Sequence, residues 1–143
     1  MSLAFALLDL KRFKAVNDTY GHPIGNQVLK TMSNMLKKRL RMTDLIGRSC
    51  GEDFAVALPD VSPSNARLVL DKVREAFSQI KQIHAGGEFN VTMSCGVAMF
   101  PDFEDVPSLT EAADQALYEA KAKGRNQVVL AAPQTAGKRT AEG

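Results

Sequence analysis

The sequence Ala4-Phe5-Ala6-Leu7-Leu8-Asp9 decides the fold, because it is a continuous apolar run that ends on a carboxylate. Such a run is typical of a central strand buried on both faces. Further on, the short apolar runs 45–47 and 54–58 flank a polar, glycine-containing segment and predict a β-hairpin. The neighbouring acids Glu52 and Asp53 belong to the tip of that hairpin.

Helical periodicity fills the sequence between the predicted strands. One long amphipathic helix is expected after Gly21-His22-Pro23, and a second after Ser62, with Pro63 at its first position. A capping box at 108–111 predicts a third helix that ends at Gly124. The remaining expected strands are 89–100 and 128–130. This alternation predicts an α/β or α+β fold.

The composition indicates one globular domain, expected over 4–132, with a disordered tail at 133–143. The chain carries 18 Lys+Arg against 16 Asp+Glu, a near balance that excludes a general nucleic-acid binder. Cys50 and Cys95 are far apart, so neither a zinc site nor a disulfide framework is expected. No apolar run approaches the ~20 residues of a membrane span. We therefore expect a cytoplasmic domain without a membrane segment.

Asp9, Glu52 and Asp53 are the residues that most directly suggest chemistry. Carboxylates on separate elements are the hard oxygen ligands that Mg²⁺ takes beside phosphate oxygens. On the residues alone a second interpretation is open, in which Glu52 and Asp53 are solvated turn residues and Asp9 caps the turn that follows it.

Three motifs in order indicate a family. They are DLKRFKAVNDTYGHPIGN at 9–26, RSCGEDF at 48–54 and AKAKGRN at 120–126. At this spacing they resemble the signatures of GGDEF domains, the diguanylate cyclases that condense two GTP molecules into cyclic di-GMP. The resemblance covers about 4–130. It implies a palm-like βαββαβ core, with a mainly antiparallel central sheet flanked by helices and the second motif on a β-hairpin.

The resemblance also implies a magnesium site. Its ligands would be the Asp9 and Glu52 side chains and the Leu10 carbonyl, with Asp53 as a further acid. A metal on phosphate oxygens stabilises the charge that develops when one GTP's 3'-hydroxyl attacks the other's α-phosphate. Gly51 would let the hairpin backbone approach the nucleotide, although a plain turn glycine is the other interpretation. Catalytic roles are thereby implied for Gly51, Glu52 and Asp53.

Several positions match the family's GTP-binding residues. Asn17 and Asn26 stand where guanine is read, and Phe13 belongs to the same motif. Lys121 and Arg125 are four residues apart on one helix face and would hold the terminal phosphates. On the residues alone, the asparagines could cap helices and the two cations could serve a helix C-terminus, a gain of ~0.3–1 kcal/mol.

Arg41-Met42-Thr43-Asp44 is an RxxD motif just upstream of the hairpin, as in the family's inhibitory product-binding site. An arginine fork binds a guanine edge or a phosphate, while aspartate accepts from guanine nitrogens. The resemblance thus implies feedback inhibition by cyclic di-GMP. The alternative is that Arg41 only extends the basic helix end at 37–39.

Four residues depart from the family pattern. Cys50 replaces the first signature glycine, Asp53 a glutamate, Asn26 an aspartate and Lys11 an acid that is common there. They favour an alternative function, a catalytically degenerate domain that binds cyclic di-GMP or GTP and regulates a partner domain. The retained residues that favour the enzyme are Gly51, Glu52, Lys121 and Arg125.

The implied reaction also predicts partners. Because each of two GTP molecules is held by one protomer, turnover implies a homodimer with facing sites. The chain begins at the first strand, without the helix that precedes it in the family. We therefore expect an N-terminal sensor or regulatory segment in a longer polypeptide.

Overall fold

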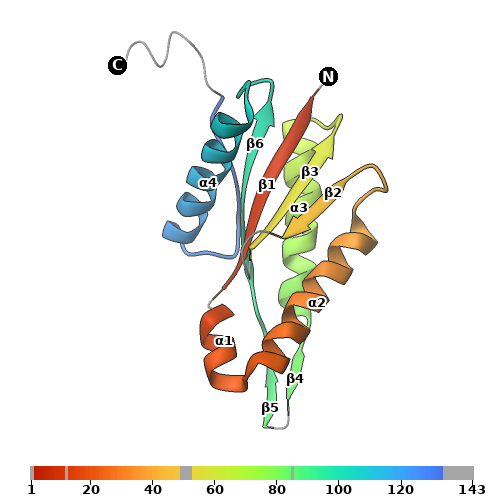
Figure 1. Ribbon diagram of the computed structural model, residues 1–143, viewed down its shortest axis with the longest axis vertical. Helices are drawn as coiled ribbons and strands as arrows, with labels where there is room; N and C mark the ends of the chain where they lie inside the picture. The colour runs from red at the N-terminus through yellow and green to blue at the C-terminus, as the bar shows by residue number, and fades with distance from the viewer. Residues whose placement is uncertain (1, 12, 49–52, 85, 134–143) are drawn as a thin grey trace.

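The computed structural model describes residues 2–11, 13–48, 53–84 and 86–133. A five-stranded sheet lies at its centre (Figure 1). Its strands are β1 (Leu3–Leu10), β2 (Leu45–Arg48), β3 (Asp53–Pro59), β6 (Met93–Phe100) and β7 (Val128–Leu130). Their order is β2-β3-β1-β6-β7, and all neighbours are antiparallel except the parallel pair β6–β7. The predicted mixed fold with a mainly antiparallel sheet is confirmed.

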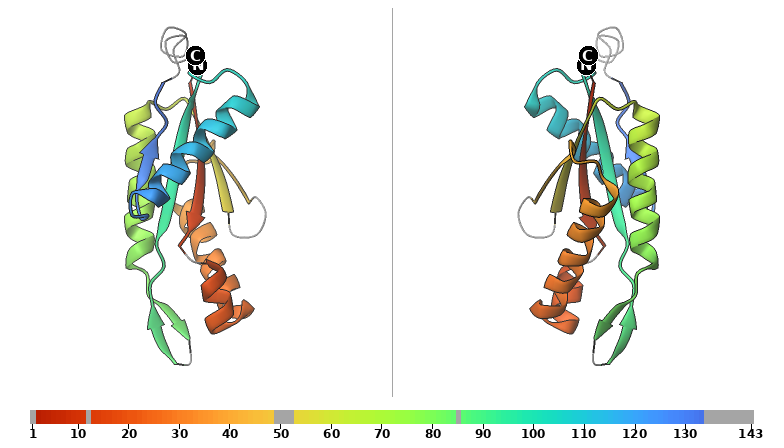
Figure 2. Two further views of the ribbon diagram at one scale, coloured as in Figure 1. Left: turned by 90° about the vertical axis from the view of Figure 1, so that its left-hand side faces the viewer. Right: turned by 90° about the vertical axis from the view of Figure 1, so that its right-hand side faces the viewer.

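Helices cover both faces of the sheet. They are α1 (Phe13–Tyr20), α2 (His22–Arg39), α3 (Pro63–Gln79) and α4 (Val106–Ala122). The buried residues of α2 and α3 pack in the main core, and α4 lies across the opposite face (Figure 2). A small hairpin of β4 (Gln82–His84) and β5 (Gly87–Phe89) projects beyond the end of the sheet.

The central strand β1 is buried more completely on one face than on the other. The residues that point into the main core, at most 2% exposed, are Ala4, Ala6, Leu8 and Leu10. Leu3, Phe5 and Leu7 face α4 and are only partly buried. The prediction of a strand buried on both faces is therefore right for one face, because α4 covers only part of the other.

Gly96 on β6 allows α4 to approach the sheet closely. A Cβ built at Gly96 would overlap the backbone nitrogen of Leu117 and the carbonyl oxygen of Ala113, and would lie 2.8 Å from the carbonyl carbon of Ala116. Only a residue without a side chain fits there. The absence of a side chain at this position sets the height of α4 above the strands.

Two helices differ from the predictions. The short helix α1 was not expected, because among its residues with described side chains only Val16 is buried in the core, with Tyr20 partly buried against it, so the apolar periodicity is weak. The N-cap of α4 is Asp105, whose carboxylate accepts from the backbone N–H of Ser108 at 2.8 Å. The predicted capping box at 108–111 was wrong by one turn, because Pro107 already occupies the first turn of the helix.

The predicted continuous strand 89–100 is broken at 90–92. The side-chain amide of Asn90 donates to the carbonyl oxygens of Ser78 and Ile80 at 2.9 and 3.1 Å. These bonds tie the chain to the end of α3. The segment that precedes the break then pairs with β4 instead of the central sheet.

Two further expectations concern the C-terminal tail and membrane spans. The tail at 133–143 lies outside them, apart from Pro133. Within them, no helix is both long and apolar enough to cross a membrane.

Candidate functional site

Two carboxylates meet at one end of the sheet. Asp9 near the end of β1 is the direct cross-strand partner of Asp53 at the start of β3, and on its other side it faces Ser94 of β6. Directly opposed residues on one face have Cβ atoms roughly 4.5–5.5 Å apart, and like charges so placed repel each other. The Asp9 side chain is 13% exposed, which strengthens that repulsion. The pair therefore favours a cation at this position.

Lys121 supplies a positive charge at this pair. It lies in the last turn of α4, and its ammonium nitrogen forms an ion pair with Oδ2 of Asp9. The close packing of α4 over Gly96 brings the lysine to the sheet end. The structure thus joins two predicted site residues that are far apart in the sequence, and the ammonium group balances the charge of Asp9.

The turn after α4 places Arg125 beside the same residues. Gly124, Arg125 and Asn126 all have positive φ, at 117°, 63° and 50°. The backbone N–H of Arg125 donates to the Ala120 carbonyl at 2.9 Å, and that of Asn126 donates to the Ser94 hydroxyl at 3.0 Å. Because Ser94 is the cross-strand partner of Asp9, the hydrogen bond from Asn126 to Ser94 holds the turn next to the carboxylates.

The other predicted nucleotide residues lie on a helical hairpin formed by α1 and α2. Phe13 begins α1, Asn17 lies within it, and Asn26 is exposed in the first half of α2. The two helices join at Gly21, which has φ 93°. Oδ1 of Asn17 is buried and accepts no hydrogen bond from any residue that the structure describes. Buried acceptors normally accept a hydrogen bond, and the edge of a nucleotide base carries N–H groups that could donate one.

A groove of about 590 Å³ opens between the sheet face and the first half of α4. Its acidic lining residues are Asp53, Glu111 and Asp114. Such a lining repels phosphate groups. The cations Lys121 and Arg125 belong instead to the last turn of α4 and to the turn that follows it.

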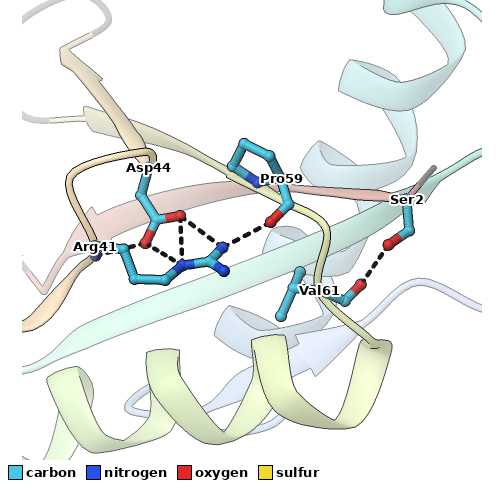
Figure 3. A network of polar contacts seen from close by, with 5 residues as sticks. All are labelled: Ser2, Arg41, Asp44, Pro59 and Val61. Carbon is cyan, nitrogen blue, oxygen red and sulfur yellow. Dashed lines mark hydrogen bonds and ion pairs between the residues drawn. The ribbon is translucent and has the colours of Figure 1, made fainter.

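The RxxD motif forms a closed polar network at the other end of β3 (Figure 3). The guanidinium of Arg41 donates to Asp44 Oδ1 at 2.8 Å and to the Pro59 carbonyl at 2.7 Å, and the Arg41 backbone N–H donates to Asp44 Oδ2 at 2.7 Å. The Asp44 side chain is 3% exposed and that of Arg41 51%. The hydrogen bond to Asp44 raises the pKa of Arg41 above its ordinary value.

This network is separate from the carboxylate pair. In the β1–β3 register Pro59 faces Leu3, whereas Asp53 faces Asp9. Pro59 lies six positions after Asp53 on β3, or roughly 20 Å away at 3.3 Å per residue. The carboxylate pair and the RxxD network therefore lie at opposite ends of β3.

Some predicted site residues lie outside the described part of the chain. They are Gly51 and Glu52, and the off-consensus Cys50 also lies outside it. Among the residues that are described, no group of three or more His, Cys, Asp or Glu side chains is placed to hold a metal ion. The roles predicted for Gly51 and Glu52 stay predictions.

Ser94 is a site residue that sequence reasoning missed. The apolar alternation of Met93, Cys95 and Val97 left Ser94 on the opposite face of its strand, but that pattern alone gave no sign of its neighbours. Cys95 itself is fully buried in the core, and burial raises the pKa of its thiol.

Known proteins share this sequence pattern. The family model described as diguanylate cyclase, GGDEF domain, matches residues 1–127. The chain is 38% identical over 130 residues to diguanylate cyclase A of Treponema denticola. This match covers 90% of the chain and 35% of that protein. It is 40% identical over 129 residues to diguanylate cyclase DgcP of Pseudomonas aeruginosa, covering 90% and 19%. The chain thus spans about a third or less of these curated relatives.

Solved structures share the fold. The GGDEF domain of DgcB from Caulobacter crescentus, in complex with c-di-GMP, has a TM-score of 0.86 at 31% identity, over 91% of this chain and 78% of that one. The GGDEF domain of PA1120 from Pseudomonas aeruginosa has a TM-score of 0.84 at 31% identity, over 92% and 83%. The chain carries its carboxylate pair at one end of the sheet and its RxxD network at the other. On these matches of sequence and structure, it belongs to the diguanylate cyclase GGDEF domain family.

Proposed function

We propose that this domain is a diguanylate cyclase, which condenses two GTP molecules into one cyclic di-GMP and two pyrophosphates. The observation that carries the proposal is the convergence of Asp9, Asp53 and Lys121 at one sheet end, beside the turn that bears Arg125. The relatives named diguanylate cyclases support it. The boundaries we propose for the domain are 4–132.

The donor set at the sheet end fits a divalent metal with a preference for oxygen ligands, and we propose Mg²⁺. Asp9 and Glu52 would hold it with the Leu10 carbonyl, and Asp53 would be a further acidic partner. When bound, the metal supplies charge neutralisation on the phosphate oxygens. Its positive charge would add to that of Lys121 beside Asp9 and Asp53.

The nucleotide would be held by the chain's own polar groups. Oδ1 of Asn17, which accepts no hydrogen bond from the described residues, is suited to accept from the Watson–Crick edge of guanine, and Asn26 would add a second amide contact. Arg125 would bind the terminal phosphates together with Lys121, which would have to leave Asp9. Phe13 begins α1, where free backbone N–H groups favour an anion.

The proposed chemistry determines the assembly and the compartment. One domain presents one nucleotide site, so the two α-phosphates and 3'-hydroxyls meet only when two domains face each other. A homodimer is therefore the proposed active form. We propose the cytoplasm, where GTP is found, as its compartment, and an N-terminal sensor segment as the means of dimerisation.

We propose that the Arg41–Asp44 network binds cyclic di-GMP and inhibits the cyclase. Its donors and buried acceptor match a guanine edge and a phosphate. The same network favours the second candidate function, a degenerate domain that binds cyclic di-GMP without turnover. The off-consensus residues Lys11 and Asn26 and the shortened acid Asp53 also favour that candidate.

One nucleotide assay tests both. The chain is incubated at high concentration with GTP and Mg²⁺, and the products are separated by chromatography beside Glu52→Gln and a fused dimer. Cyclic di-GMP from the wild type and none from Glu52→Gln is the expected result. Normal product from Glu52→Gln would refute the metal assignment. No product even from the fused dimer, together with cyclic di-GMP binding that Arg41→Ala abolishes, would establish the degenerate domain.

A further inference from the structure

The turn that carries Arg125 is an unusual piece of backbone. Three residues in succession have positive φ, and two of them, Arg125 and Asn126, have side chains that disfavour this conformation. Asparagine tolerates it better than arginine does. Such a backbone persists only where its surroundings hold it in place.

The bonds that hold the turn come from three directions. From the sheet, the Ser94 hydroxyl accepts from the Asn126 backbone N–H at 3.0 Å. From within, the side-chain amide of Gln127 donates to the carbonyls of Lys123 and Arg125 at 3.3 and 3.1 Å. From α3, the guanidinium of Arg74 donates to Oδ1 of Asn126 at 3.0 Å.

Arg74 is itself fixed in position. Its Nε donates to the carboxylate of Asp71, one turn earlier in α3, at 2.7 Å, and its side chain is only 17% exposed. The helix packs against β7, directly after the turn, so the arginine reaches Asn126 from the face of the sheet opposite to α4 (Figure 2). The donors of the Arg74 guanidinium form a rigid planar fork, so the hydrogen bond from Nε to Asp71 fixes the orientation of the whole group.

We infer that Arg74 is a positioning residue for nucleotide binding, which holds Asn126 and thereby keeps Arg125 aimed at the phosphates. The inference rests on the proposed function, and it deepens it by adding a residue that lies on the far side of the sheet and contacts no nucleotide. Arg74 acts through the backbone of the turn. Its removal weakens GTP binding without removing a phosphate ligand.

The test measures GTP affinity by calorimetry, with Mg²⁺ present, for the wild type and Arg74→Met. Methionine keeps the apolar stem of the side chain and removes the donors. The matched control is Arg67→Met, which alters an exposed arginine on the same helix. We expect the Kd for GTP to rise about tenfold in Arg74→Met, as for the loss of a hydrogen bond from a charged group, and to stay unchanged in Arg67→Met.

A double-mutant cycle separates positioning from general destabilisation. In the Arg125→Ala background, Arg74→Met should have no further effect on GTP affinity, because the group that it positions is gone. Effects that add would overturn the inference. So would a wild-type Kd in Arg74→Met.

A measurement without nucleotide distinguishes failure of this inference from failure of the proposed function. Hydrogen exchange of the Asn126 amide, which donates to Ser94, should be faster in Arg74→Met than in the wild type or Arg67→Met. If the wild type binds no GTP, the proposed function fails and this exchange rate still decides whether Arg74 holds the turn. An unchanged rate refutes the inference.

Discussion

Replacing Gly96 by alanine tests the close packing on which the candidate site depends. The added methyl group would lie 2.8 Å from the carbonyl carbon of Ala116, whereas ordinary contacts begin near 3.4 Å, and it would overlap backbone atoms of Ala113 and Leu117. Because these atoms belong to a helix backbone, no side-chain rotation relieves the clash. The helix α4 must move away by at least 0.6 Å, the difference between the two distances.

The cost follows from the nature of the clash. Overpacking a core with one methyl group typically costs about 1–3 kcal/mol, and a rigid backbone neighbour puts Gly96→Ala at the upper end, about 3 kcal/mol. For a chain of this length, that loss lowers Tm by roughly 10 °C. The displacement of α4 also moves Lys121 and the turn that bears Arg125 away from the end of the sheet, so the variant should lose GTP affinity as well as stability.

Urea unfolding followed by circular dichroism measures the free energy of unfolding. The control is Gly47→Ala on the edge strand β2, where the added Cβ would have the Ala55 carbonyl oxygen 4.0 Å away and no closer neighbour among the described residues. The control should stay within about 0.5 kcal/mol of the wild type. If Gly96→Ala were equally stable, α4 would not lie as close to the sheet as the structure places it.

Two further predictions concern ionisable groups. The backbone N–H of Ser108 lowers the pKa of Asp105 below its ordinary value of 3.8, so the N-cap contributes stability that is fully present above that pH and lost as the pH falls through the lower folded-state pKa. The Tm difference between the wild type and Asp105→Ala should therefore be largest at neutral pH and vanish in strong acid; a difference independent of pH would contradict the capping role. Since burial raises the pKa of the Cys95 thiol, a Cys50→Ser variant should react with a thiol reagent only after unfolding, and rapid labelling of the native protein would show that Cys95 is accessible.

The strands and the long helices could be predicted because their apolar periods are strong. The runs that became β1, β3 and β7 were each identified, and Ser62 was correctly assigned as the N-cap of α3, where its hydroxyl accepts from Asn65. The start of α4 was misplaced because Asp105 and Ser108 both carry capping signals one turn apart. Only the position of Pro107 distinguishes them.

The contacts within the site could not be predicted in the same way. The ion pair of Lys121 with Asp9 joins residues more than 100 positions apart, and no local pattern reports it. The opposition of Asp9 and Asp53 depends on strand register, in which a shift by one residue would turn Asp53 to the other face. The motif at 41–44 likewise identifies Arg41 and Asp44 as candidate binding residues, but it does not show that the two side chains bind each other.

Because Arg41 and Asp44 bind each other, their mutual hydrogen bonds compete with any bonds that the two side chains could form to a ligand. A ligand that needs the Arg41 fork and the Asp44 carboxylate must first separate them, and its observed affinity is the intrinsic affinity multiplied by the fraction of molecules in which the pair is open. If about one molecule in a hundred is open, binding weakens roughly a hundredfold. The Pro59 carbonyl, which accepts from Arg41, then adjusts the concentration at which the site responds without touching the ligand. If the pair binds cyclic di-GMP as proposed, the hydrogen bonds of Arg41 to Asp44 and Pro59 set the ligand concentration at which the site responds.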